Sequence, residues 1–248
     1  MRSERYLKTH VVGVTALLGL LAWAIGRSGL DLFIAHLTYD DAAGAFVGRH
    51  SHILSLLADR IMIALPLLIG ACAVAIIGAG LRRPDLRPFR GVCTAVLVVL
   101  VAGPVAAILL KHLTALPRPY MLQLFGGALP LPTHFFALTG QASGGALPST
   151  HAAAGYALFA LYFAARMLDR PALMRLGLAL AIAWGAGLSV LRIVQGAHFL
   201  SQTVWSAAMV WLLASLIFLP FLNARDRGVL TKVAVIPRQR LRRECVEP

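Results

Sequence analysis

The chain has 248 residues, of which 59% are hydrophobic and only 13% are charged. Soluble domains carry about 25% charged residues, so this composition excludes an ordinary soluble protein and indicates an integral membrane protein. The net charge of +13 would suit a nucleic-acid-binding protein. The basic residues cluster between apolar runs, however, as determinants of membrane topology do. We therefore expect membrane lipids as partners, and no nucleic acid.

The first apolar run follows a short basic start and resembles a signal peptide, but no convincing cleavage site follows it. We interpret it as an uncleaved first span. A helix needs about 20 apolar residues to cross the hydrocarbon core of a bilayer. The stretches that meet or approach this requirement are 11–30, 56–80, 91–112, 149–167, 173–193 and 200–222. The sequence thus predicts an all-α, polytopic six-transmembrane-helix bundle over residues 1–222, followed by a basic cytoplasmic tail, 223–248.

The distribution of basic residues predicts the orientation of the bundle. If the N-terminus is cytoplasmic, 17 of the 23 Lys and Arg residues lie on the cytoplasmic side. Both termini are then inside a plasma (inner) membrane, and the loops after the first, third and fifth spans face the periplasm or exterior.

Six basic residues contradict this bias. Arg27, Arg49 and Arg60 lie in or near the first outer loop, where we expect ordinary interfacial residues. The other three, Lys111, Arg118 and Arg192, map to the outer ends of spans. A charged side chain costs roughly 2.5–3.5 kcal/mol near the bilayer centre and less toward the interface. Each of the three alone could be a side chain that reaches the headgroups. Together they favour a polar site at the outer ends of the helices.

Two further segments place polar residues at the same end. In "GGALPSTHAAAGY", Ser149 is a suitable N-cap for the fourth span, and His151 lies in the first turn. The free N–H groups at such a helix start favour an anion. In "LRIVQGAHFLSQ", Gly196 suits a tight turn, and His198 and Gln202 are spaced i, i+4 on one helical face. Gln202 could therefore fix the tautomer of the imidazole.

The combined inventory is two histidines, three cations, a hydroxyl group and a helix N-terminus. It fits a phosphoryl group, with donors for its oxygens, one histidine as nucleophile and one as acid. The chain has 10 carboxylates, none clustered near these segments. We therefore expect no metal site and no cofactor.

The three segments resemble the motifs of the type-2 phosphatidic acid phosphatase family, which includes the vanadium haloperoxidases. Its motifs are K-x6-R-P, P-S-G-H and S-R-x5-H-x3-D. This chain has Lys111-x6-Arg118-Pro119, then Pro148-Ser149-Thr150-His151, then Arg192-x5-His198-x3-Gln202. "GAHFLS" is similar to the third motif of a bacterial branch. Thr150 replaces Gly, Leu191 replaces Ser and Gln202 replaces Asp.

The resemblance implies a metal-independent, two-step phosphatase. His198 would attack phosphorus to form a phosphohistidine, and His151 would protonate the leaving oxygen and then activate water. Lys111, Arg118, Arg192, Ser149 and the backbone at Thr150 would hold the phosphate. A backbone N–H remains at Thr150 if φ there is negative. Gln202 can orient His198 but adds no charge, and Asp59 is the acid we would name as a substitute.

The location of the site implies a lipid phosphate as substrate. Undecaprenyl pyrophosphate, phosphatidic acid, phosphatidylglycerol phosphate and lipid A phosphate all fit. A lipid-to-lipid phosphotransferase using the same site is an alternative. A non-catalytic transport or proton-relay protein is another, although no internal repeat is visible and the polar clusters lie at one edge. No sequence feature specifies an oligomeric state.

Overall fold

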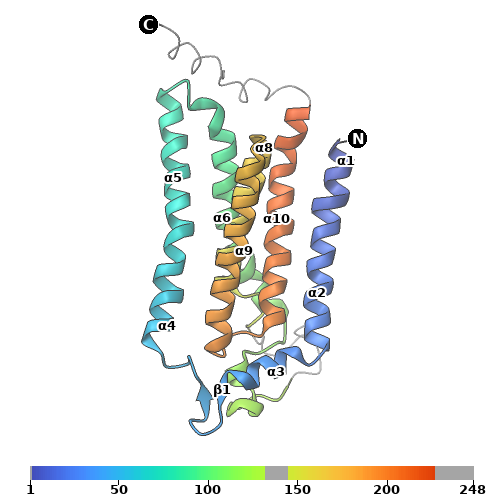
Figure 1. The fold of residues 1–248 in the computed structure, drawn as a ribbon, viewed down its shortest axis with the longest axis vertical. Coiled ribbons are helices and arrows are strands. Elements are labelled where there is room, and N and C mark those ends of the chain that lie inside the picture. The colour runs from blue at the N-terminus through green and yellow to red at the C-terminus, as the bar shows by residue number, and fades with distance from the viewer. Residues whose placement is uncertain (1, 132–144, 227–248) are drawn as a thin grey trace, which may run out of the picture.

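The computed structural model describes residues 2–131 and 145–226 of the chain. Within them, five helices are long and apolar enough to cross a membrane, with a sixth, interrupted helical segment between the third and the fourth. Figure 1 shows the long helices standing side by side as an all-α bundle. The five candidate spans are Glu4–Arg27, His52–Arg82, Arg87–Leu113, Pro171–Val194 and Leu200–Phe221. All five overlap predicted spans, so the predicted polytopic helical bundle is confirmed.

The individual elements of these spans are as follows. The first comprises α1 (Arg2–Tyr6), the π-helix η1 (Leu7–Val14) and α2 (Thr15–Arg27), and the second comprises α4 (His52–Leu56), the π-helix η2 (Leu57–Ile61) and α5 (Met62–Arg82). The third comprises η3 (Arg87–Phe89), α6 (Arg90–Leu110) and η4 (Lys111–Leu113), and the last two are α9 (Pro171–Val194) and α10 (Leu200–Asp226). α10 continues beyond the predicted end at 222, while residues 227–248 of the predicted tail lie outside the described part.

The predicted fourth span, 149–167, is two consecutive helices instead of one. α7 (Thr150–Tyr156) and α8 (Phe159–Met167) are separated by a turn at Ala157 and Leu158. Around it, the backbone N–H groups of Leu158, Ala160 and Leu161 bond three residues back instead of four. Both helices pack against α9. The six predicted apolar segments are therefore all helical, but only five of them are uninterrupted.

Close packing of α7 against α9 depends on glycine. A Cβ atom on Gly155 would lie 2.8 Å from the Cα atom of Gly185, and a Cβ on Gly185 would lie 2.2 Å from the ring of Tyr156. Small residues at a contact between membrane helices let the two backbones approach. The core beside this contact is built mainly from α6, α7, α8 and α10, with Val99, Phe163 and Val210 fully buried.

The end of the bundle away from Arg2 and Asp226 carries several short elements that the sequence analysis did not predict. They are α3 (Leu30–Leu37), the antiparallel strands β1 (Tyr39–Asp40) and β2 (Ala45–Phe46), and the 3₁₀ helices η5 (Pro119–Met121) and η6 (Gln123–Phe125). Figure 1 shows α3 and β1 beneath the long helices. Phe46, Leu122, Phe125 and Phe199 form a second small core there.

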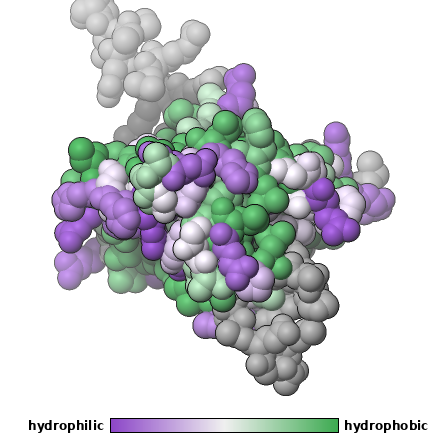
Figure 2. Space-filling model, turned by 90° about the horizontal axis from the view of Figure 1, so that it is seen from below, coloured by the Kyte–Doolittle hydropathy of each residue, from purple (hydrophilic) through white to green (hydrophobic). Residues whose placement is uncertain are grey.

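The surface has the pattern of a membrane protein. Large apolar side chains are exposed along the bundle, among them Leu17, Leu67, Val101, Leu176 and Val190. Figure 2 looks at the end that carries α3, where groups of hydrophilic side chains lie among apolar ones. The helix ends at Arg2 and Asp226 both lie at the opposite end (Figure 1). The loops that carry the predicted site therefore face away from both of these helix ends.

Candidate active site

The turn that carries the third motif lies between α9 and α10. Gly196 has φ +65°, and a Cβ atom there would lie 2.2 Å from the ring of Phe46. The position therefore requires glycine for both backbone conformation and space. The N–H of Ala197 donates to the carbonyl of Arg192 at 2.9 Å, which closes the turn. The tight turn predicted at Gly196 is present and places His198 just before α10.

His198 and Gln202 form the predicted i, i+4 pair. The Oε1 atom of Gln202 lies 3.3 Å from Nδ1 of His198 and also accepts from the backbone N–H of Phe199 at 3.1 Å. Its Nε2 donates to the carbonyl of Pro117 at 3.4 Å. Because a backbone donor and a backbone acceptor fix the amide, its oxygen faces His198. An amide oxygen only accepts, so this contact favours the neutral tautomer with the proton on Nδ1 and the lone pair on Nε2.

His198 is strongly desolvated, with only 4% of its surface exposed. Burial, followed by the nearby charges of Lys111 and Arg118, lowers the pKa of His198 from 6.5 to about 3, although hydrogen bonding to Gln202 and Ala146 opposes this shift. The imidazole is therefore neutral at physiological pH, which is the state that a nucleophile needs.

The second motif forms a capped helix start, as predicted. Ser149 is the N-cap of α7, and its Oγ accepts from the N–H of Ala152 at 3.4 Å. The first i→i−4 bond of the helix runs from Ala153 to the carbonyl of Ser149. The N–H groups of Thr150 and His151 precede this bond and point out of the helix start. Thr150 is helical and does not have a positive φ, so its N–H keeps the orientation that the sequence analysis required.

Four hydrogen bonds tie the loop of the first motif to the other two motifs. They are Thr114 Oγ1 to the carbonyl of Leu147 at 3.2 Å, the N–H of Ala146 to the carbonyl of Leu116 at 3.3 Å, Gln202 Nε2 to the carbonyl of Pro117, and the N–H of Tyr120 to the carbonyl of Gly196 at 3.1 Å. The structure thus brings the three separate motifs of the sequence into one cluster.

The three predicted phosphate-binding cations meet in this cluster. Lys111 starts η4 directly after α6, and its charge acts on those of Arg118 and Arg192. Nη1 of Arg118 donates to the hydroxyl of Tyr120 at 3.4 Å. The guanidinium of Arg49 lies over the same ring, 3.5 Å from its centroid. Arg49, expected to be an ordinary interfacial residue, therefore lies beside Arg118 and adds positive charge to this end of the bundle.

Asp59 connects Arg192 with His151. Its Oδ1 atom lies 2.9 Å from Nε2 of His151 and forms an ion pair with Nη2 of Arg192. The same Nη2 atom also contacts Nε2 of His151. Asp59 thus lies with His151 and Arg192, whereas the hydrogen-bonding side chain beside His198 is Gln202. The expectation that Asp59 would take over support of His198 is not met.

Two buried polar groups of the predicted phosphate-binding residues have no hydrogen-bond partner among the described residues. They are Nε of Arg192 and Oγ1 of Thr150. A buried donor without a partner costs about 1–3 kcal/mol. Both groups belong to residues around the start of α7, where the helix N–H groups also point outward. An anion bound here could satisfy all of these donors together.

Sequence reasoning missed several residues that support the cluster. Ser206 Oγ accepts from the N–H of Ser149 at 2.8 Å and donates to the carbonyl of Gln202 at 2.9 Å, which joins α7 to α10. Its i+4 spacing from Gln202 was a usable signal. Asp31 of α3 accepts from the N–H of Ser201 at 2.9 Å and from its hydroxyl, and so caps α10. No local pattern indicates that contact.

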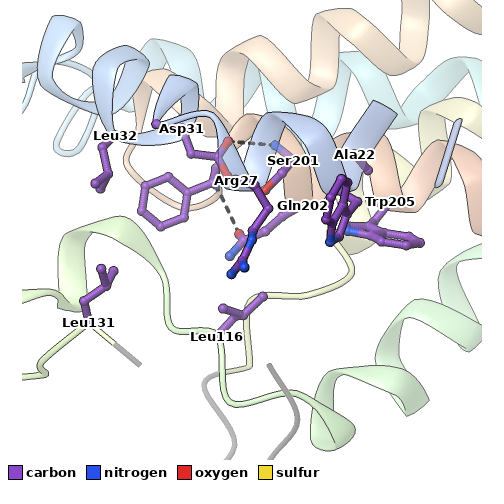
Figure 3. A pocket seen from close by; sticks show the side chains of 13 residues that line it. Ala22, Arg27, Asp31, Leu32, Leu116, Leu131, Ser201, Gln202 and Trp205 are labelled. Carbon is purple, nitrogen blue, oxygen red and sulfur yellow. Dashed lines mark hydrogen bonds between the residues drawn. The ribbon is translucent and has the colours of Figure 1, made fainter. Parts of the chain in front are cut away.

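A pocket of about 340 Å³ lies between α2, α3 and the start of α10, and Gln202 forms part of its wall. Figure 3 shows that the Arg27 side chain points into it and that Asp31 borders it through its bonds to Ser201. Much of the rest of its lining is apolar and includes Trp23, Leu116, Phe199 and Trp205. Gln202 lines this pocket, but the two histidines and the three predicted cations do not, so it is distinct from the predicted phosphate site.

No three His, Cys, Asp or Glu side chains in residues 2–131 and 145–226 are grouped so that they could hold a metal ion. The charged side chains of the cluster are mostly cationic, which suits an anion. Metal independence of the reaction stays a prediction.

The fold and the site define a polytopic, all-α membrane protein with a cationic, histidine-containing cluster at one end of its helix bundle. A family model described as "PAP2 superfamily" matches residues 91–226, which is more than half of the chain. The chain therefore belongs to the PAP2 superfamily, the type-2 phosphatidic acid phosphatases, and this membership implies phosphatase activity on phosphate esters. No curated protein and no solved structure matches it.

Proposed function

We propose that the protein is a lipid phosphatase that hydrolyses a phosphate monoester or pyrophosphate through a phosphohistidine on His198. The observation that carries this proposal is the convergence of the three motifs. They place a neutral, buried imidazole, a second histidine and three cations at one end of a membrane bundle. Membership of the PAP2 superfamily supports the same reaction class.

In the first step, Nε2 of His198 attacks phosphorus while the bond to the leaving oxygen breaks. His151 gives its proton to that oxygen, so the lipid leaves as an alcohol or, from a pyrophosphate, as a lipid monophosphate. In the second step, neutral His151 takes a proton from water as the water oxygen attacks phosphorus. The P–N bond breaks, which releases phosphate and neutral His198.

The remaining residues stabilise negative charge on the phosphoryl oxygens. Lys111, Arg118 and Arg192 supply positive charge, and the N–H groups at the start of α7 supply aligned donors. Ser149 holds that helix start in place as its N-cap. These groups are arranged before substrate arrives, so they need little reorganisation during the reaction.

The substrate class follows from the position of the site at one end of a membrane bundle. A phosphate held there belongs to a molecule whose hydrophobic tail stays among lipids. Undecaprenyl pyrophosphate, phosphatidic acid, phosphatidylglycerol phosphate and lipid A phosphate share this chemistry. We propose that one of these classes is the substrate, with the site on the periplasmic or exterior side of an inner membrane.

The test is phosphate release from a panel of these four lipids by detergent-purified protein, with and without EDTA. We expect release from at least one lipid, without an added acceptor and without loss in EDTA. His198→Ala should abolish release, and His151→Ala should lower it by about 10²–10⁴-fold for a poor leaving group. Loss of activity in EDTA that Mg²⁺ restores would contradict the mechanism.

A phosphotransferase is the alternative outcome of the same experiment. Such an enzyme would release no phosphate from a lipid donor alone and would transfer it when a second lipid is added. A transport protein would do neither. Wild type and His198→Ala would then leave all of the lipids equally intact.

A further inference from the structure

Asp59 is held in a defined place beside two residues of the proposed site. It lies in the π-helix η2, and its Oδ1 atom contacts His151 from α7 and Arg192 from α9. An isolated ion pair with a half-exposed carboxylate would contribute little to stability. A functional role for Asp59 therefore requires that the surrounding structure fixes its position.

Four contacts fix the segment around Asp59 along the C-terminal half of α9 and the turn that follows it. The N–H of Gly48 donates to the carbonyl of Val194 at 3.0 Å, and Nε2 of Gln195 donates to Oγ of Ser55 at 3.3 Å. The ion pair of Asp59 with Arg192 is the third contact. The fourth is a 2.6 Å bond from Nε1 of Trp184 to the carbonyl of Met62. Between Ser55 and Met62 the backbone takes the rare π form, which often marks functional sites.

The charges around His151 oppose one another. Arg192 touches its imidazole, and the charge of Lys111 from η4 also acts on it. Burial disfavours a positive charge on the ring most strongly and both cations add to this effect, whereas the carboxylate of Asp59 at 2.9 Å favours the charge. A general acid must carry its proton when substrate arrives. Asp59 is the negatively charged partner that opposes the two cations.

The two histidines therefore have contrasting partners. His198 faces the neutral amide of Gln202, which orients the ring without stabilising an imidazolium ion. His151 faces a carboxylate, which stabilises one. A neutral partner on one histidine and a carboxylate on the other separate the proton affinities of the two rings, as expected for a nucleophile paired with an acid. Position 202 lacks the carboxylate of the family motif, but a carboxylate, that of Asp59, lies beside the other histidine.

We infer that Asp59 is a positioning residue for His151, which it orients through Nε2 and whose protonated form it favours for the role of general acid. This inference rests on the proposed function. Asp59 acts through His151 and is not assigned any contact with the reacting atoms. A purely structural ion pair between α9 and η2 would predict a change in stability only.

The experiment compares wild type with Asp59→Asn, which keeps the shape and removes the charge. kcat/KM is measured against pH with a lipid phosphate monoester and with p-nitrophenyl phosphate, whose leaving group needs little protonation. With the lipid, Asp59→Asn should move the alkaline limb to lower pH by about one unit or more. At pH 8 it should lower the lipid rate by about tenfold or more, and the p-nitrophenyl phosphate rate by much less.

Two variants control for trivial effects. Asp59→Glu keeps the charge and should restore most of the alkaline limb. Asp40→Asn removes a carboxylate from the β-hairpin at the same end of the bundle, where its Oδ1 accepts from the N–H groups of Ala42 and Ala43. It should leave the pH profile unchanged. An unchanged profile in Asp59→Asn, or an equal loss with both substrates, would overturn the inference.

A second measurement separates this inference from the proposed function. The imidazole of His151 can be titrated by NMR in protein carrying ¹⁵N-labelled histidine, with His151→Gln to assign the signal. Asp59→Asn should lower the pKa of His151 whether or not the protein turns over any lipid. Failure of wild type to release phosphate would defeat the proposed function alone, while an unshifted titration in Asp59→Asn would defeat the role of Asp59.

Discussion

Gln202 is held on three sides, and those contacts define what a substitution removes. Its oxygen accepts from His198 and from the backbone of Phe199, and its nitrogen donates to Pro117. Only 1% of the residue is exposed, so water cannot replace the lost partners. The side chain therefore favours the tautomer of His198 that leaves the Nε2 lone pair available for the proposed attack.

We expect Gln202→Leu to lower kcat by at least about tenfold, which corresponds to about 1.4 kcal/mol in the barrier. The leucine fills similar space but accepts no hydrogen bond from Nδ1, so the ring loses the contact that favours one tautomer. Gln202→Asp supplies the carboxylate of the family motif, and kcat should be no lower than in wild type. The assay is initial-rate kinetics on one lipid phosphate, with thermal unfolding in detergent as a check on folding. Equal kcat for Gln202→Leu and wild type would remove Gln202 from the mechanism.

The buried imidazole of His198 also predicts how stability depends on pH. Its pKa is about 3 in the folded protein, compared with 6.5 for an unperturbed histidine. Between these values the unfolded chain binds the proton and the folded protein does not, so stability falls as the pH is lowered from 6.5 toward 3. His198→Asn lacks this titration. We expect Tm to drop more in wild type than in His198→Asn between pH 7 and pH 4.5, and parallel curves would contradict the low pKa.

At the scale of secondary structure elements, the contact of α7 with α9 orients the helix start that is proposed to bind phosphate. We expect Gly155→Ala to lower thermal stability, because its new Cβ would lie 2.8 Å from backbone atoms of α9 and the helices must separate. Overpacking of this kind costs about 1–3 kcal/mol. Gly78→Ala in α5 is the matched control, since nothing lies within 4 Å of its Cβ position. Detergent unfolding curves of the two variants test this, and a Gly155→Ala curve that overlies that of Gly78→Ala would show that the contact tolerates a methyl group.

Local elements of the site were predictable from sequence, and distant ones were not. The i, i+4 pair of His198 and Gln202 and the Ser149 cap depend on neighbouring residues of one helix, whose geometry is fixed by the helix itself. Asp59 meets His151 across 92 positions of the chain, and that contact depends on how two helices pack. Asp31 capping α10 is a case of the same kind. The carboxylates of the site were therefore the residues that sequence reasoning misplaced or missed.

The same distinction holds for the elements. Long apolar runs predicted most spans within a few residues, because hydrophobic length is a local property. The first span is the exception, since its helix already begins before residue 11, at Glu4 in the polar start of the chain. The turn between α7 and α8 lies inside an apolar run without proline, so nothing in the pattern marked it. The strands β1 and β2 have two residues each, which is too short for an alternating pattern to be recognised.

At the scale of the whole molecule, the helix ends at Arg2 and Asp226 lie at one end and the site lies at the other (Figure 1). Either end of the bundle could face the cytoplasm. The excess of basic residues near the termini and in the loops after the second and fourth predicted spans favours cytoplasmic termini. A substrate lipid would then be dephosphorylated on the periplasmic or exterior side.

Cysteine labelling decides between the two orientations. In a background in which the three native cysteines are replaced by serine, Ala43→Cys places a thiol in the exposed turn between β1 and β2, beside the site. Asp85→Cys places one in the exposed loop after α5, at the opposite end. A membrane-impermeant maleimide should label Ala43→Cys in intact cells and Asp85→Cys only after permeabilisation. Because one reagent is used on a matched pair, poor reactivity at one position cannot imitate a reversed result. Labelling of Asp85→Cys alone in intact cells would place the site in the cytoplasm and restrict its substrates to lipids of the inner leaflet.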